Sequence, residues 1–220
     1  MLPIRDANPR KRFPILTIGL ILANLIIFVA NYYDGEEMEV MCRLGFVPAE
    51  GFSLRKAISS MFMHGGWSHL IGNMWFLWLF GDNVEDTLGK VQYIFLYFLS
   101  GLAATGAHYL SNIHQEIPAV GASGAISGVI GAYLYLFPRA KVYVIWGVEL
   151  LKVSARGYLI VWFIYQLIYG IVSSIFMEHS QIPMGGIAFW AHIGGFIAGW
   201  LLARALTRTP KAASYAQVAI

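Results

Sequence analysis

The chain has 220 residues, of which 58% are hydrophobic and only 12% are charged. Soluble domains carry about 25% charged residues, so this composition excludes an ordinary soluble domain and indicates an integral membrane protein. The formal net charge of +3 does not indicate nucleic acid as a partner, because the basic residues flank long apolar runs, as they do in membrane proteins. Cys42 is the single cysteine, which excludes an internal disulfide.

Six apolar runs are long enough to cross a bilayer, which takes about 20 residues of helix. They cover residues 13–33, 57–81, 91–111, 121–137, 157–177 and 187–206. The first run is long for a signal peptide and no cleavage site follows it, so it is expected to stay as a helix. The sequence predicts an all-α membrane protein: a six-transmembrane-helix bundle over residues 13–206, an N-terminal arm over 1–12 and a tail over 207–220. Residues 82–90 are expected to form a tight charged turn, and 138–156 a basic loop.

The basic residues are distributed unevenly over the two sides of this predicted bundle. Six spans put both termini on one side, and twelve of the fifteen lysines and arginines lie on that side. Basic segments stay on the cytoplasmic side of a membrane. We therefore expect a multi-pass protein of the cell membrane with both termini in the cytoplasm.

The fourth run has glycines at positions 121, 124, 128 and 131, so one helical face carries almost no side chains. Such a face lets a neighbouring helix approach closely in a bilayer. Ser123 lies just inside the expected helix start, where free backbone N–H groups can hold an anion. The same pattern also fits a packing helix with an incidental hydroxyl.

Polar side chains also occur at the same expected depth in the second and sixth runs. His69 and Asn73 are four residues apart and share one helical face; they could be hydrogen-bond donors for a reaction or an interhelical hydrogen bond. His192 precedes Gly195 and Gly199, whose spacing allows close packing against the fourth run. That packing would bring His192 towards Ser123, and a histidine beside a serine can activate its hydroxyl.

Together these groups supply what acyl transfer needs: a nucleophile, a base and donors for an oxyanion. The sequence around them resembles the rhomboid family of intramembrane serine proteases. The resemblance lies in four segments: Gly-Ala-Ser-Gly at 121–124, Ala-His-Ile-Gly-Gly at 191–195 with Gly199, His-Gly-Gly-Trp-Ser-His-Leu-Ile-Gly-Asn at 64–73, and Gly81 with Glu85 and Gly89.

The resemblance implies that Ser123 is the nucleophile and His192 the general base, in a dyad without an acidic third member. It implies that His69 and Asn73 are oxyanion donors and that His64 is structural. The implied activity is that of a serine endopeptidase that cleaves single-span transmembrane proteins in or near the bilayer. The implied partners are such substrates and the lipid bilayer, with no nucleic acid, no cofactor and no metal.

Two questions stay open at this point. Some family members have an aromatic residue one turn after the nucleophile, stacked on the histidine, and this chain has Ser127 there. Either the Ser127 hydroxyl or another group must orient His192. The alternative function is a catalytically inactive rhomboid-like protein that binds transmembrane helices; such relatives typically lack the serine or the histidine. A small transporter fits less well, because no span core carries a charged residue. The sequence does not predict the physiological substrate, its cleavage site or the oligomeric state.

Overall fold

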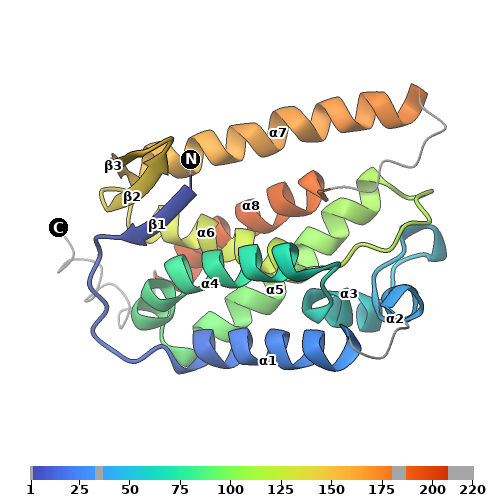
Figure 1. Ribbon diagram of the computed structural model, residues 1–220, viewed down its shortest axis with the longest axis horizontal. Coiled ribbons are helices and arrows are strands. Elements are labelled where there is room, and N and C mark those ends of the chain that lie inside the picture. The colour runs from blue at the N-terminus through green and yellow to red at the C-terminus, as the bar shows by residue number, and fades with distance from the viewer. Residues whose placement is uncertain (1, 33–36, 180–186, 208–220) are drawn as a thin grey trace.

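The computed structural model describes residues 2–32, 37–179 and 187–207. It is mostly helical, as predicted. The helices are α1 (Ile15–Tyr32), α2 (Glu37–Leu44), α3 (Leu54–Ser59), α4 (Trp67–Leu88), α5 (Lys90–Ser111), α6 (Ser123–Leu136), α7 (Ala155–His179) and α8 (Phe189–Leu206), with 3-10 turns at Pro48–Glu50 and Ser60–Phe62. The strands are β1 (Leu2–Asp6), β2 (Lys141–Trp146) and β3 (Glu149–Ser154). In Figure 1, α1 and α7 lie along opposite sides of the molecule, with α4, α5, α6 and α8 between them.

In the part of the chain that the structure describes, three helices are long and apolar enough to cross a membrane: α5, residues Ala155–Ile175 of α7, and α8. Two shorter apolar helices, Ile15–Asn31 of α1 and α6, run beside them. The remaining long helix, α4, ends in a charged segment. These helices are those of an α-helical membrane protein, and the count of six spans stays a prediction.

The second predicted span differs from the helix observed. Residues 57–62 belong to α3 and a 3-10 turn, and α4 begins only at Trp67. The expected charged turn at 82–90 is wrong, because α4 continues through Leu88 and only Gly89 separates it from α5. Gly89 has φ +79°, a conformation that favours glycine, so the reversal takes a single residue.

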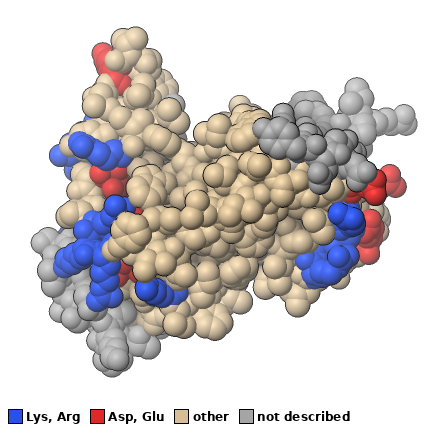
Figure 2. Space-filling model, turned by 60° about the horizontal axis from the view of Figure 1, so that its bottom comes forward, with Lys and Arg blue, Asp and Glu red and all other residues tan. Residues whose placement is uncertain are grey.

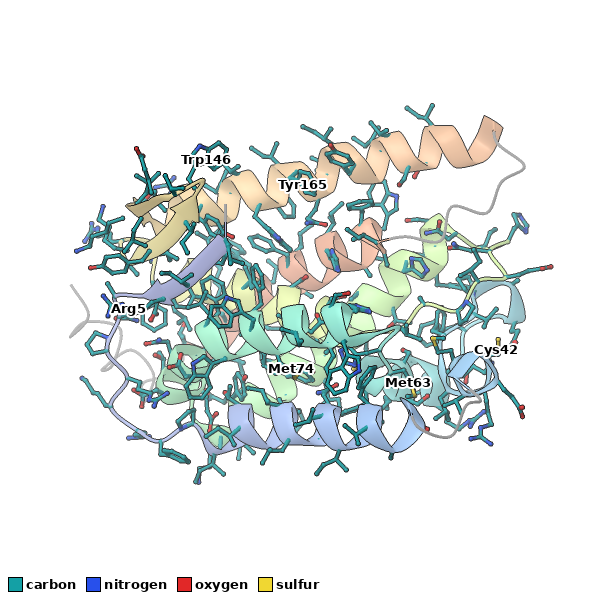
Figure 3. All side chains as sticks on the ribbon, viewed as in Figure 1. Arg5, Cys42, Met63, Met74, Trp146 and Tyr165 are labelled. Carbon is teal, nitrogen blue, oxygen red and sulfur yellow. The ribbon has the colours of Figure 1, made fainter. Side chains whose placement is uncertain are left out.

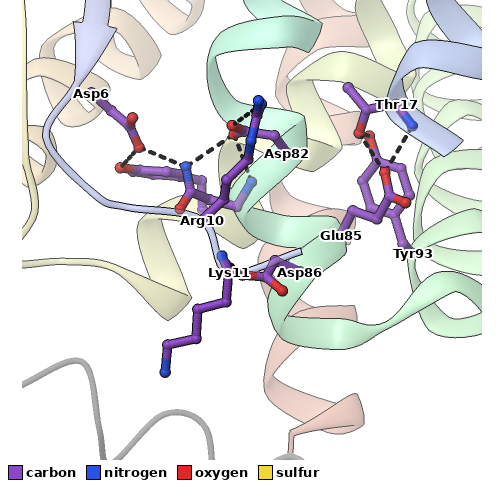
Figure 4. Close-up of polar contacts among 10 residues, drawn as sticks. Asp6, Arg10, Lys11, Thr17, Asp82, Glu85, Asp86 and Tyr93 are labelled. Atoms are coloured by element: carbon purple, nitrogen blue, oxygen red, sulfur yellow. Dashed lines mark hydrogen bonds and ion pairs between the residues drawn. The ribbon is translucent and has the colours of Figure 1, made fainter. Parts of the chain in front are cut away.

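The carboxylates that suggested a turn are held within α4 by the N-terminal segment (Figure 4). Glu85 accepts hydrogen bonds from the backbone N–H of Leu16 at 3.0 Å and of Thr17 at 2.8 Å, and from the Thr17 hydroxyl. It thereby caps the free N–H groups at the start of α1, where a negative charge is stabilising. Asp82 contacts Arg10 at 3.3 Å, and Asp86 accepts from the Lys11 N–H at 2.6 Å.

A small antiparallel sheet, which was not predicted, covers one end of the bundle. The expected basic loop at 138–156 contains a hairpin of β2 and β3, and β1 from the N-terminal arm pairs with β2. Asp6 fastens this sheet to two helices, since it accepts from Asn83 of α4 at 2.9 Å and from the Tyr133 hydroxyl of α6 at 2.8 Å. Burial raises the pKa of Asp6 to about 6, so at neutral pH it is a carboxylate that accepts both bonds.

The core of the molecule is α6. All ten residues from Gly124 to Tyr133 are buried. A Cβ at Gly199 of α8 would overlap the carbonyl oxygen of Gly128, and one at Gly195 would overlap that of Gly124. The two backbones are therefore in direct contact, as the glycine spacings predicted, and this contact fixes where α8 presents His192.

Replacing Gly199 with alanine should therefore destabilise the protein, because the new methyl group has to push α8 away from α6. We expect a loss of about 1–3 kcal/mol, measured as a lower midpoint of thermal unfolding in detergent. The matched control is Gly106→Ala in α5, where a Cβ meets nothing within 4 Å. That change should be neutral or stabilising by up to about 1 kcal/mol, because alanine is the better helix former. Equal midpoints for the two variants would refute the contact.

Candidate active site

A cavity of about 650 Å³ lies among α4, α6, α7 and α8. All four residues predicted for the site line it: Ser123, His192, His69 and Asn73. Ser123 is the first residue of α6, and His192 lies in the first turn of α8. Three helices that are far apart in the sequence thus bring these polar side chains to one cavity.

Ser123 and His192 are in hydrogen-bond contact. The distance from Ser123 Oγ to His192 Nε2 is 2.8 Å. This is the separation at which a histidine can take a proton from a serine hydroxyl. This short distance follows from the packing of α6 against α8, because Ser123 and His192 lie at the N-terminal ends of two helices whose backbones touch.

Gln166 of α7 makes the second hydrogen bond of His192. This residue was not predicted from the sequence as part of the site. Its Oε1 lies 2.9 Å from His192 Nδ1, and the residue is only 4% exposed. An amide oxygen can only accept, so Nδ1 of His192 is the protonated nitrogen. In a neutral imidazole, Nε2 then has the free lone pair. This is the tautomer that can accept the proton of Ser123.

The ring of His192 also packs against an aromatic residue, which comes from α7. The Trp162 and His192 ring centroids are 6.1 Å apart, with the planes inclined by 32°. Trp162 and Gln166 are four residues apart and share one face of α7. The Ser127 hydroxyl instead donates to the backbone carbonyl of Ser123 at 2.7 Å. A group other than Ser127 therefore orients His192. This answers the question, left open by the sequence, of whether the Ser127 hydroxyl has that role.

Asn73 and His69 contribute polar edges near Ser123. Asn73 is 7% exposed, and its Nδ2 has no hydrogen-bond acceptor among the described residues. His69 lies over Gly121: a Cβ at Gly121 would be 2.8 Å from His69 Nε2 and 3.6 Å from Ser123 Oγ. Gly121 also has φ +126°, which favours glycine. Because Gly121 lacks a side chain, the side chains of His69 and Ser123 can both lie next to it.

The start of α6 adds backbone donors. No side chain caps this helix at Ala122, so the N–H groups of its first turn stay available beside Ser123. A helix N-terminus carries partial positive charge, which attracts an oxyanion. The cavity therefore places side-chain and backbone donors around one hydroxyl.

A further histidine, His108 of α5, lines the same cavity. Its Nδ1 lies 3.3 Å from the Asn112 amide nitrogen. Among the described residues, the Ser123 hydroxyl is hydrogen-bonded to His192 and not to His108. The dyad pairing is thus unaffected.

Comparison with known proteins identifies the family of this chain. Residues 52–209 match the family model described as the rhomboid domain. The chain belongs to the rhomboid family. The matched segment contains all four predicted site residues and also Gln166, so the whole cavity lies within the rhomboid domain.

Three of the curated relatives are rhomboid proteins of a plant, a yeast and a mammal. "RHOMBOID-like protein 5" of Arabidopsis thaliana is 31% identical over 156 residues, covering 71% of this chain and 45% of the relative. "Rhomboid protein 1, mitochondrial" of Saccharomyces cerevisiae is 39% identical over 89 residues, covering 39% and 26%. The human "Presenilin-associated rhomboid-like protein, mitochondrial" is 26% identical over 129 residues, covering 58% and 34%. This chain therefore spans less than half the length of these three relatives.

Proposed function

We propose that this rhomboid protein is an intramembrane serine endopeptidase that cleaves single-span transmembrane proteins within or near the bilayer. The observation that carries the proposal is the 2.8 Å contact between Ser123 Oγ and His192 Nε2 in a cavity among helices. The resemblance of the chain's motifs to those of serine proteases supports the same conclusion.

The proposed reaction begins with His192. Gln166 accepts the Nδ1–H bond, so Nε2 accepts the proton of Ser123 as the oxygen attacks the scissile carbonyl carbon. The π electrons of the carbonyl move to its oxygen. The resulting oxyanion would be stabilised by the Ser123 N–H, His69 and Asn73.

The second half of the reaction returns the proton. The imidazolium of His192 protonates the leaving amine as the tetrahedral intermediate collapses to an ester on Ser123. Water, deprotonated by His192, then attacks the ester, and Ser123 recovers its proton on release of the acid. Two protein groups and one water thus complete the cycle, with no cofactor needed for its balance.

The position of the cavity supports the proposed substrate class. The cavity lies among helices of a membrane protein and is lined by both apolar and polar side chains, which suits a peptide that comes from within or beside the bilayer. A helical substrate has to unwind to expose its carbonyl. Glycine or proline near the cleavage site would lower that cost.

We further propose that both termini lie on the same face of the bilayer, the face that has most of the lysines and arginines. In the cell membrane this face would be cytoplasmic. The names of the yeast and human relatives say "mitochondrial", and fractionation of cells that express the full chain would decide between the two membranes.

The proposed function is tested with purified protein in liposomes together with a model single-span substrate that has a glycine-containing transmembrane helix. The expected result is two fragments, cut in or beside the span, as determined by mass spectrometry. The inactive, helix-binding alternative predicts co-purification of an intact substrate. Binding without any cleavage by the wild-type chain would refute the endopeptidase.

Gln166 gives a prediction specific to this chain. Gln166→Met keeps the approximate size of the side chain but removes the acceptor for His192 Nδ1–H. We expect kcat to fall about tenfold, the equivalent of one lost orienting hydrogen bond, with KM nearly unchanged, because Gln166 acts through His192. Steady-state cleavage kinetics in liposomes measure both.

The matched control is Gln166→Glu, which keeps an acceptor oxygen at the same place. Its kcat should stay well above that of Gln166→Met. If the two variants lose activity equally, or if the loss is in KM alone, then Gln166 packs α7 against α8 and does not orient the imidazole.

A further inference from the structure

The three-stranded sheet has one face packed on the helices and one face turned outward. Its inner face is apolar: Val142 and Val144 are fully buried in the core, and Leu151 and Val153 pack against it. Because side chains alternate along a strand, the neighbouring residues of β2 and β3 form the outer face. The sheet lies at the end of the molecule where α1 and α7 begin (Figure 1).

The outer face carries a row of cationic and aromatic side chains. Arg5, Tyr143 and Lys152 lie side by side across the three strands. Arg5 Cζ is 4.7 Å and Lys152 Nζ 5.5 Å from the centre of the Tyr143 ring. A hydrogen bond from Lys152 and its positive charge, with a smaller contribution from Arg5, lower the pKa of Tyr143 below its usual value. The row thus concentrates positive charge on an exposed surface.

No carboxylate neutralises this row among the described residues. The ion pairs of the chain's described part involve Arg10, Arg12 and Lys56. Glu149, the hairpin's one acidic residue, pairs with Trp146 and alternates to the opposite face from Lys152. Figure 2 shows Lys and Arg side chains gathered at this end of the molecule. The row therefore lacks an anionic partner within the described chain.

A second, apolar row lies beside the first, towards the hairpin tip. Leu2, Ile145 and Leu150 are paired across the strands and are all exposed. Val148 at the tip is 103% exposed, and Trp146, which pairs with Glu149 and so lies on the opposite face, is 55% exposed. Figure 3 shows Trp146 at the outer edge of the molecule, beside the start of α7. The face is thus amphipathic, with cations on one side and large apolar groups on the other.

The level of the sheet relative to the bilayer follows from α7. β3 runs directly into this helix, whose membrane-spanning window begins at Ala155. Lys152 is three strand residues before it, or about 10 Å at most. The headgroup region is about 5–8 Å thick on each side of the hydrocarbon core. If α7 enters the hydrocarbon core near Ala155, the Arg5–Tyr143–Lys152 row lies beside the lipid headgroups, where tryptophan and tyrosine are also enriched.

We propose that the outer face of the sheet binds anionic phospholipid headgroups of the surrounding bilayer. Arg5 and Lys152 contact the phosphates, and Ile145 and Leu150, with Val148 at the tip, enter the boundary of the acyl chains. The charge complementarity and the depth of the row favour a lipid over a soluble anion. This surface is separate from the Ser123 cavity, and its function does not depend on peptidase activity.

The test uses the full chain with Cys42→Ser, which removes the only native cysteine, and Val148→Cys labelled with the polarity-sensitive dye NBD. The protein is placed in nanodiscs of phosphatidylcholine alone or mixed with phosphatidylglycerol. We expect stronger, blue-shifted emission in the phosphatidylglycerol discs. Arg5→Gln with Lys152→Gln should abolish this difference, because about fivefold in lipid affinity is lost for each charge removed.

The matched control is Arg43→Gln with Arg55→Gln, which removes the same charge from exposed residues of α2 and α3. It should leave the emission difference intact. A label-free titration of each variant with phosphatidylglycerol by native mass spectrometry gives the affinities directly and also reports whether the protein is folded.

Equal emission in both lipids, or equal loss in the two double variants, would overturn the proposal. The emission could also be the same in both lipids but rise with the protein concentration in detergent. That result would assign the face to a second copy of the chain and would overturn the proposal as well.

Discussion

Replacing Ser123 with alanine should abolish cleavage of a transmembrane substrate, with a loss of about 10⁴-fold or more in kcat, because the hydroxyl that forms the ester intermediate is lost. Folding should be retained. The substitution removes one hydroxyl and its hydrogen bond to His192, which costs about 1 kcal/mol. His192→Ala should be similarly inactive, since Ser123 would lose the group that accepts its proton. Fragment formation in liposomes measures both.

Ser127→Ala is the matched control, because Ser127 lies one turn further along the same helix and its hydroxyl bonds only to the Ser123 carbonyl. That variant should retain most of the activity. Substantial cleavage by Ser123→Ala, or equal losses in the two serine variants, would remove Ser123 from the role of nucleophile.

The second large effect is expected at the oxyanion donors. Asn73→Ala should lower kcat by about 10²–10³-fold, the usual cost of removing one such donor, and leave KM nearly unchanged. The reason is that Asn73 Nδ2 has no acceptor among the described residues and lies in the cavity, so its hydrogen bond forms only when charge develops on the substrate. His69→Ala should have an effect of the same kind.

Asn31→Ala controls for the loss of a helix asparagine, since the Asn31 amide donates to the backbone of its own helix at Ile27. It should leave kcat unchanged. If Asn73→Ala and His69→Ala lower the unfolding midpoint but leave kcat at the wild-type value, the two residues hold helices together and do not stabilise an oxyanion.

The pairing of Ser123 with His192 could be predicted because it depends on local patterns. Glycine spacings in two runs allow two backbones to touch, and each run has one polar residue near its start. Backbone contact then leaves little freedom in how the two side chains meet.

Gln166 and Trp162 were missed for a physical reason. They belong to α7, and Gln166 is 26 positions before His192, a separation with no helical spacing that would relate the two side chains. A signal was present nonetheless: Gln166 is the one amide in the apolar run 157–177. An amide in a span is costly and usually faces a partner inside the protein.

The sheet and the length of α4 depend on the N-terminal arm. Residues 141–146 are rich in β-branched and aromatic residues and are followed by Gly147, which has φ +61°, and this pattern could have indicated a hairpin. The pairing of β1 with β2 spans most of the chain, however, and no local pattern indicates it. Likewise, Asp82, Glu85 and Asp86 suggested a turn because their partners lie about 70 residues earlier.

The most direct test of the proposed dyad is covalent labelling of the full wild-type chain in detergent with a serine-reactive fluorophosphonate, followed by peptide mass spectrometry. The activated-serine account predicts one modified residue, Ser123, with labelling lost in His192→Ala and strongly slowed in Gln166→Met. Three results would contradict it: a folded wild-type chain that is not labelled, a label on another serine, or labelling that is unchanged in His192→Ala.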